Sequence, residues 1–188
     1  MIYTNATIKD IEGIRALQKK FHVDTVSDED RPHGFVTTLF TEDQLADLIE
    51  KENGIVIAKD GDRVISYAMA ASWEYWSVWP LFAFMIEDLP SIHYLGRRLS
   101  TENSYQYGPI CIDTPYRGSH VLLKVFDVSR EQMNRRYPVL ITFINQINGR
   151  SVEAHTRKLG LEILKEFSFN RQRYFTLGYD TSVPVKGL

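Results

Sequence analysis

Apolar residues along this chain repeat with two different periods, and the changes between them divide it into predicted helices and strands. A short apolar run at 2–6 favours a strand. It is followed by a helical stripe made of Ile8, Ile11, Ile14, Leu17 and Phe21. Residues 24–38 are polar and mixed, which favours a loop. Thr41-Glu-Asp-Gln44 is a capping box that opens a second helix, and this helix is predicted to end at Asn53-Gly54.

The next segments alternate in the manner of strands. Runs at 55–59 and 63–71 are joined by Asp60-Gly61-Asp62, and because Gly supplies the positive φ of a tight turn, this pattern predicts a β-hairpin. Residues 72–101 do not continue this strand-like alternation and contain many aromatic residues and several prolines. They read as an insertion between the third predicted strand and the fourth.

The second half returns to a regular order. A strand at 103–112 precedes a helix whose inner stripe is Leu122, Val125, Phe126, Ser129 and Met133. Pro138 ends that helix, and the remaining elements are a buried strand at 139–144, a helix at 151–159 and strands at 161–169 and 173–177. We therefore expect one mixed α/β domain over 1–188, with 105–112 and 139–144 as parallel neighbours joined by a helical crossover.

The composition limits the expected partners and compartment of the protein but does not indicate an activity. The formal net charge of −2 at pH 7 gives no electrostatic reason to expect nucleic acid or an anionic membrane as a partner. The lone cysteine, Cys111, excludes an internal disulfide and lies in an apolar run, so we expect a packing role for it. The first residues do not resemble a secretory signal, and the most apolar run, 76–86, is too short to span a bilayer, so a cytoplasmic protein is expected.

Two segments carry candidate chemistry. Tyr116-Arg117-Gly118 follows an apolar strand and opens a helix, where unpaired N–H groups and the positive end of the helix dipole favour a phosphate. The second segment runs from Asn148 to Gly160 and carries Ser151 and His155.

Together these segments and the element order resemble the GCN5-related N-acetyltransferase (GNAT) superfamily. The resemblance implies an α/β (α+β) fold: a mixed central sheet of six to seven strands flanked by about four helices, here with an aromatic-rich insertion at 72–102. It also implies transfer of an acetyl group from acetyl-CoA to an amine by direct attack. The acceptor, a small molecule or a peptide, is not identified by the sequence.

The resemblance also implies site residues. Strand residues Ile110, Cys111 and Ile112 would bind the pantetheine arm, with a backbone N–H there polarising the thioester. The turn formed by Arg117, Gly118, Ser119, His120 and Val121 would bind the pyrophosphate. His120 and Leu122 depart from the family pattern, which has small residues there. Asn148 and Ser151 would contact the cofactor from the later helix.

His155 stands where family members often carry a tyrosine that protonates the CoA thiolate. An imidazole can do the same work near neutral pH, although a buried structural histidine fits the helix pattern equally well. Glu102 is the candidate general base, and Tyr107 is a candidate for lining the acceptor site. No ligand spacing among His22, His33, His93, His120 and His155 predicts a metal site.

The aromatic insertion has two interpretations. Tyr75 and Trp76 could line the acceptor site, or the insertion could be an extra helix that packs on the core or forms a homodimer face. The function likewise has alternatives to catalysis: a non-catalytic acyl-CoA-binding or regulatory module, or an interaction domain on the same fold.

Overall fold

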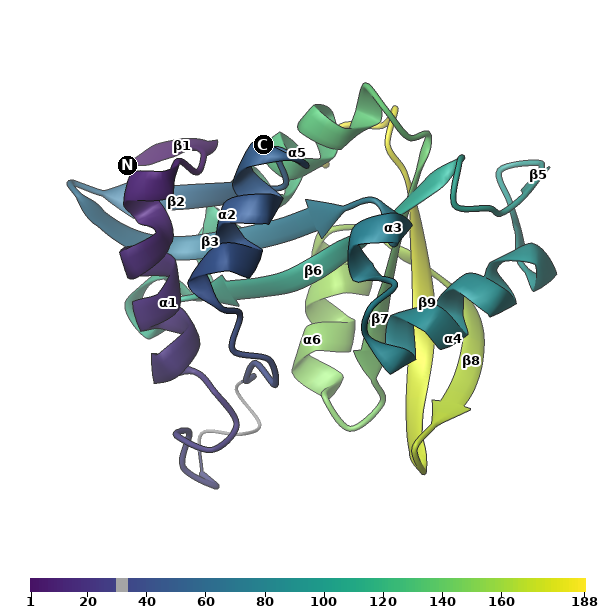
Figure 1. Ribbon diagram of the computed structural model, residues 1–188, viewed down its shortest axis with the longest axis horizontal. Coiled ribbons are helices and arrows are strands. Elements are labelled where there is room, and N and C mark those ends of the chain that lie inside the picture. The colour runs from purple at the N-terminus through teal and green to yellow at the C-terminus, as the bar shows by residue number, and fades with distance from the viewer. Residues whose placement is uncertain (30–33) are drawn as a thin grey trace. The chain divides into compact units, whose positions relative to one another are not determined.

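The computed structural model describes residues 1–29 and 34–188 and divides them into two compact units (Figure 1). Unit 1 comprises Met1–Ala70, Gly108–Ser129 and Gly187–Leu188, and unit 2 comprises Ala71–Tyr107 and Arg130–Lys186. The loop expected at 24–38 is confirmed in its described parts. Positions 30–33, which include His33, lie outside the described residues.

Most elements match the predicted positions. Unit 1 contains β1 (Ile2–Asn5), α1 (Ile11–Lys20), α2 (Glu42–Glu50), β2 (Ile55–Asp60) and nearly all of β3 (Arg63–Ala71). Unit 2 contains α3 (Trp73–Trp76), α4 (Pro80–Asp88), β4 (His93–Tyr94), β5 (Arg97–Arg98), β7 (Val139–Asn145), α6 (Gly149–Glu153), β8 (Glu162–Phe169) and β9 (Gln172–Asp180). Besides β3, whose last residue belongs to unit 2, β6 (Ser104–Ile112) and α5 (Val121–Asn134) contribute to both units.

Within the described part of the chain, seven strands are hydrogen-bonded in the order β1-β2-β3-β6-β7-β9-β8. Their number agrees with the predicted six to seven. Strands β6 and β7 are parallel, with Ser104 to Gln106 opposite Val139 to Ile141, as expected. The flanking pairs β1–β2, β2–β3, β7–β9 and β8–β9 are antiparallel. A mixed α/β fold with a largely antiparallel sheet is thereby confirmed.

Local sequence signals account for the elements of unit 1. Thr41 caps α2 by accepting the N–H of Gln44, and the Gln44 side chain accepts the N–H of Thr41, so the predicted capping box is confirmed. Gly61 adopts a φ of +59° in the turn between β2 and β3. Figure 1 shows α1 and α2 on the viewer's side of β2 and β3. Helix α1 buries Ile14 and Leu17.

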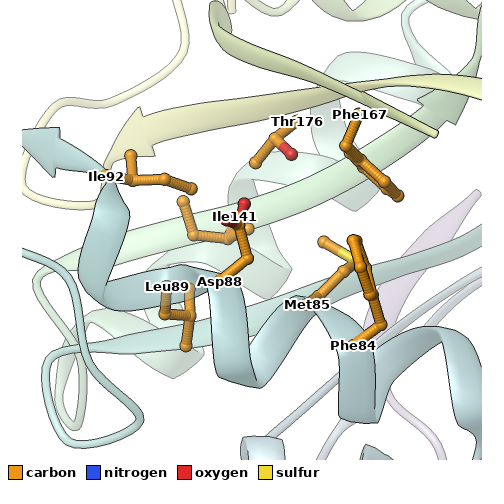
Figure 2. Close-up of a pocket in the computed structure, with 8 residues that line it drawn as sticks. All are labelled: Phe84, Met85, Asp88, Leu89, Ile92, Ile141, Phe167 and Thr176. Carbon is orange, nitrogen blue, oxygen red and sulfur yellow. The ribbon is translucent and has the colours of Figure 1, made fainter. Parts of the chain in front are cut away.

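The insertion forms a layer of its own in unit 2. Helices α3 and α4 and a short β4–β5 hairpin occupy it. Figure 2 shows Phe84 and Met85 of α4, and Leu89 of the 3₁₀ turn that follows it, beside Ile141 of β7 and Phe167 of β8. The space among these side chains is too small for a water molecule, so this seam is core packing.

No helix in residues 1–29 and 34–188 is long and apolar enough to cross a membrane.

Candidate functional site

The predicted phosphate turn is built at the end of β6 in unit 1. After Ile112 the chain forms a short 3₁₀ turn at Thr114–Tyr116, runs through Arg117 to His120 and enters α5 at Val121. The Tyr116 hydroxyl donates to the Asp60 carboxylate at 2.6 Å and ties the turn to the β2–β3 hairpin. The turn is therefore held by elements distant in the sequence.

Asp113 is the principal anchor of this turn. Its carboxylate is fully buried and accepts hydrogen bonds from Lys20 Nζ at 2.6 Å, from Arg63, and from the Thr114 N–H at 2.9 Å. Burial by itself would raise the pKa of Asp113, but the hydrogen bond and charge of Lys20 with the other donors outweigh it, and the pKa is lowered. Asp113 is therefore ionised at neutral pH and fixes the end of α1 to the start of the turn.

Arg117 is held within unit 1. Its Nε donates to the carbonyl of Ile112 at 2.9 Å, and its guanidinium lies 4.6 Å from the ring centroid of Phe21. These contacts join Arg117 to the end of β6 and set the direction of the chain as it enters the turn.

The start of α5 presents backbone donors. Within the described residues, the amides of Gly118, His120, Leu122 and Leu123 have no protein acceptor. Gly118 has a φ of +82°, and a Cβ built on it would meet no atom within 4 Å, so the space beside its backbone is open. His120 is exposed. Donors beside open space at a helix N-terminus fit a pyrophosphate.

Cys111 is a buried thiol and carries no sign of activation. Its side chain is 6% exposed, and its carbonyl accepts the Ser66 hydroxyl at 2.8 Å. Burial raises the pKa of the Cys111 thiol to about 12. A packing role therefore agrees with the environment of this residue.

We expect native protein at pH 8 to resist alkylation of Cys111 by iodoacetamide. The rise in its pKa from 9.0 to about 12 lowers the thiolate fraction roughly a thousandfold. Mass spectrometry of native and guanidinium-unfolded samples measures the difference. Labelling at equal rates in the two samples contradicts this assignment.

The second predicted segment follows β7 in unit 2. Asn148 caps α6 by accepting the N–H of Ser151 at 3.1 Å, so the helix begins two residues before the predicted start at 151. The helix then widens into a π-helix over Ala154–Lys158. Such widened turns occur often at functional sites. His155 lies in this stretch, with Leu159 after it.

The hydrogen bond of His155 defines its tautomer. Nδ1 lies 2.8 Å from the Ser151 carbonyl, which can only accept, so Nδ1 carries the proton and Nε2 of the neutral ring keeps a lone pair. Burial lowers the pKa of His155 below 6.5, and the Ser151 hydrogen bond opposes this only in part. The ring is 5% exposed and is neutral at pH 7. Nε2 is therefore a proton acceptor.

Tyr107 completes the cluster around His155. The two ring centroids are 6.3 Å apart in an edge-to-face arrangement. Burial raises the pKa of Tyr107 well above its ordinary value, so the phenol stays protonated. The Tyr107 carbonyl accepts Thr142 Oγ1 at 2.7 Å and Gln106 Nε2 at 2.6 Å. The structure thus brings Asn148, Ser151, His155 and Tyr107 together.

Glu102 lies apart from this cluster. It is exposed in the turn before β6. Between this turn and Tyr107 lies the strand segment from Ser104 to Tyr107, which by itself spans ~10 Å. The structure does not bring Glu102 to His155.

The predicted acceptor residues Tyr75 and Trp76 lie in α3 of the insertion. Trp76 is fully buried against the rings of Tyr75, Trp79 and Phe82, at centroid distances of 4.9, 5.7 and 5.0 Å. Tyr75 is partly exposed. Phe82 in turn contacts Phe143 of β7. The burial of Trp76 agrees with the interpretation that the insertion packs on the core. Of the two residues, only Tyr75 is exposed enough to contact an acceptor directly.

Among the side chains that the structure describes, no group of three His, Cys, Asp or Glu residues could hold a metal ion. Sequence reasoning missed Asp113 as an anchor, although an Asp between a strand and Thr-Pro is a recognisable cap signal. It also had no means of finding Lys20, Arg63 and Phe21. Their roles depend on contacts between distant segments.

No model of a protein family matches the sequence, and no curated protein matches it. Solved structures match it along nearly its whole length. A GNAT-family acetyltransferase from Streptococcus pneumoniae is 12% identical, with 95% of this chain and 98% of that chain covered and a TM-score of 0.63. The putative acetyltransferase yncA from Salmonella typhimurium, solved with acetyl-CoA, is 11% identical, with 98% of each chain covered and a TM-score of 0.62.

A ribosomal-protein-alanine N-acetyltransferase from Brucella melitensis is 16% identical, with 96% of this chain and 99% of that chain covered and a TM-score of 0.60. At these identities the likeness concerns the fold. This chain has the fold of the GNAT acetyltransferases.

Proposed function

We propose that this protein is an N-acetyltransferase that moves an acetyl group from acetyl-CoA to an amine. The observation that carries the proposal is the segment 118–123 at the start of α5. Among the described residues, the amides of Gly118, His120, Leu122 and Leu123 have no protein acceptor, and the space beside Gly118 is open. A fold shared with a structure that holds acetyl-CoA supports it.

The turn and β6 would hold the cofactor. The amides at 118–123 and the dipole of α5 suit the pyrophosphate, and Arg117 and the exposed His120 add donors beside it. Ile110, Cys111 and Ile112 of β6 and Asn148 and Ser151 of α6 are assigned to the rest of acetyl-CoA by the family resemblance. Acetyl-CoA supplies the thioester carbonyl that a neutral amine attacks.

His155 would move the protons of this reaction. Its neutral Nε2 can take a proton from an acceptor ammonium, and the resulting imidazolium can protonate the departing thiolate. The same ring then serves first as base and afterwards as acid. Glu102 remains a candidate base only through intervening water.

Calorimetric titration with acetyl-CoA tests the cofactor assignment, with desulfo-CoA and adenosine diphosphate as comparison ligands. We expect micromolar binding of acetyl-CoA and weaker binding of the diphosphate. Release of free CoA thiol with a panel of amines, amino acids and peptide N-termini then tests catalysis. Folded protein that binds no acetyl-CoA contradicts the proposal.

Charge reversal at Arg117 is expected to weaken acetyl-CoA binding about tenfold or more. Glutamate places an anion near the pyrophosphate and removes the contacts with Ile112 and Phe21. Arg136→Glu is the matched control, because Arg136 is an exposed arginine that also lies over a ring, 5.1 Å from Tyr137. If the two variants bind acetyl-CoA with equal affinity, the assignment of Arg117 to the phosphate site is wrong.

A second candidate is a non-catalytic acyl-CoA-binding domain. His120 and Leu122 favour it, since the family has small residues at both positions and a Cβ restricts close approach of a ligand. Binding of acetyl-CoA without thiol release for any amine is the result expected for this candidate.

A further inference from the structure

A hollow of about 270 Å³ lies in unit 2, and none of the residues assigned to acetyl-CoA lines it. Its wall is formed by the end of the π-helix at 157–160, the start of β8, the end of β9 and the segment after β9. The volume is just below the ~300–1,000 Å³ typical of drug-sized ligand sites, so the hollow suits a small molecule.

Three cationic side chains border this hollow, Arg157, Lys158 and Lys186. Arg157 forms an ion pair with Glu153 at 3.3 Å. Within residues 1–29 and 34–188, neither lysine ammonium has an ion pair or a hydrogen bond. Both lysines are exposed. An anionic group there could accept hydrogen bonds from both lysines, and no existing contact of either lysine would have to break.

Two carboxylates border the same hollow, Glu162 and Asp180. One oxygen of Glu162 accepts the Tyr94 hydroxyl at 2.7 Å, and one oxygen of Asp180 accepts the Ser182 N–H at 2.9 Å. Within the described chain, the other oxygen of each carboxylate has no donor. Burial and the two carboxylates raise the pKa of Tyr94, which therefore remains a donor.

Apolar surface lies beside the charges. Val183 is 42% exposed, and Leu159, although it borders the hollow, is buried. Gly160 has no side chain to fill the space, and its φ of +83° turns the backbone between the π-helix and β8. Besides Arg157, which is paired with Glu153, the hollow thus offers two lysines, two carboxylates and apolar side chains within one small volume.

We propose that this hollow binds a free amino acid with an apolar side chain. The ligand's carboxylate pairs with Lys158 and Lys186, its ammonium pairs with Glu162 and Asp180, and its side chain lies against Leu159 and Val183. A simple anion would leave the carboxylates repelling it, and a simple cation would meet the lysines. Only a ligand with both charges satisfies both pairs.

The test is calorimetric titration of the full chain with L-leucine, without acetyl-CoA, so that the result does not depend on the proposed acetyltransferase activity. N-acetyl-leucine removes the ammonium charge, and leucine methyl ester removes the carboxylate charge. We expect leucine to bind and each blocked form to bind at least about tenfold more weakly. Equal binding of either blocked form, or no binding of leucine at millimolar concentration, overturns the proposal.

Variants locate the site. The double variant Lys158→Ala with Lys186→Ala, and separately Asp180→Asn, are each expected to weaken leucine binding at least about tenfold. Lys19→Ala, which removes a lysine of α1 in unit 1, is the control and should bind leucine as the natural chain does. Because the lysines are exposed, the double variant is expected to fold, and thermal unfolding checks it. Undiminished binding in the folded double variant overturns the proposal.

Discussion

Replacing His155 by alanine is expected to lower turnover by about 10²–10³-fold while leaving the affinity for acetyl-CoA unchanged. The reason is the position of its proton. Because the Ser151 carbonyl takes Nδ1–H, the other ring nitrogen can act on substrate protons, and alanine has no group to do so. Steady-state rates and calorimetric titration on the same preparations separate the two effects.

The dependence of activity on pH is a second measurement, and it would not change if His155 had only a structural role. Burial lowers the pKa of His155, so its neutral form persists below pH 6.5. Activity should therefore be retained at pH 6.5 and fall only at lower pH, and this acidic decline should vanish in the variant. His155→Asn, which can still donate to the Ser151 carbonyl, controls for packing. Loss of stability without loss of turnover in both variants identifies His155 as a core residue.

Replacing Asp113 by asparagine is expected to destabilise the protein by about 2–3 kcal/mol at pH 7 and to weaken acetyl-CoA binding. Asparagine keeps the shape but removes the charge that pairs with Lys20 and Arg63. Half or more of each cation's side chain is exposed, and these groups can turn to water, so we place the loss below that of a fully buried pair. Urea unfolding measures the free energy.

The effect of this change depends on pH in a defined direction. The folded-state pKa of Asp113 is lowered, so its stabilising contribution is complete above about pH 4 and is lost as the pH falls through the folded value. The difference between the natural chain and Asp113→Asn should therefore shrink in acid. Asp47→Asn, which removes an exposed ion pair with Lys51, is expected to change stability by less than about 0.5 kcal/mol. A similar loss in both variants contradicts the role given to Asp113.

Much of the fold was predictable because its signals are local. The hairpin at Asp60–Asp62 and the capping box at Thr41 depend on residues within four positions of one another, and the structure confirms both. The parallel pairing of β6 with β7 followed from a strand-helix-strand pattern with a buried second strand.

The parts that were not predictable are side-chain environments. Sequence spacing placed Trp76 in an aromatic cluster but could not show that its side chain is fully buried, with the rings of Tyr75 and Phe82 against it. It placed His155 on a helix, yet the π-helix and the Ser151 hydrogen bond, which determine its tautomer, appear only in three dimensions. Glu102 was chosen as the nearest acid in sequence, which says little about distance in the folded chain.

The anchors of the turn at 113–117 also bear on the order in which this chain folds. The partners of Asp113 and Tyr116 stand 93, 50 and 56 positions earlier, at Lys20, Arg63 and Asp60. Contacts between residues so far apart close long loops. Closing a loop costs chain entropy, and this cost comes before the contacts stabilise the fold. During synthesis, α1 and the β2–β3 hairpin leave the ribosome first and can form a surface on which the later segment docks. We therefore expect this five-residue segment, although its sequence looks self-contained, to acquire its shape late in folding.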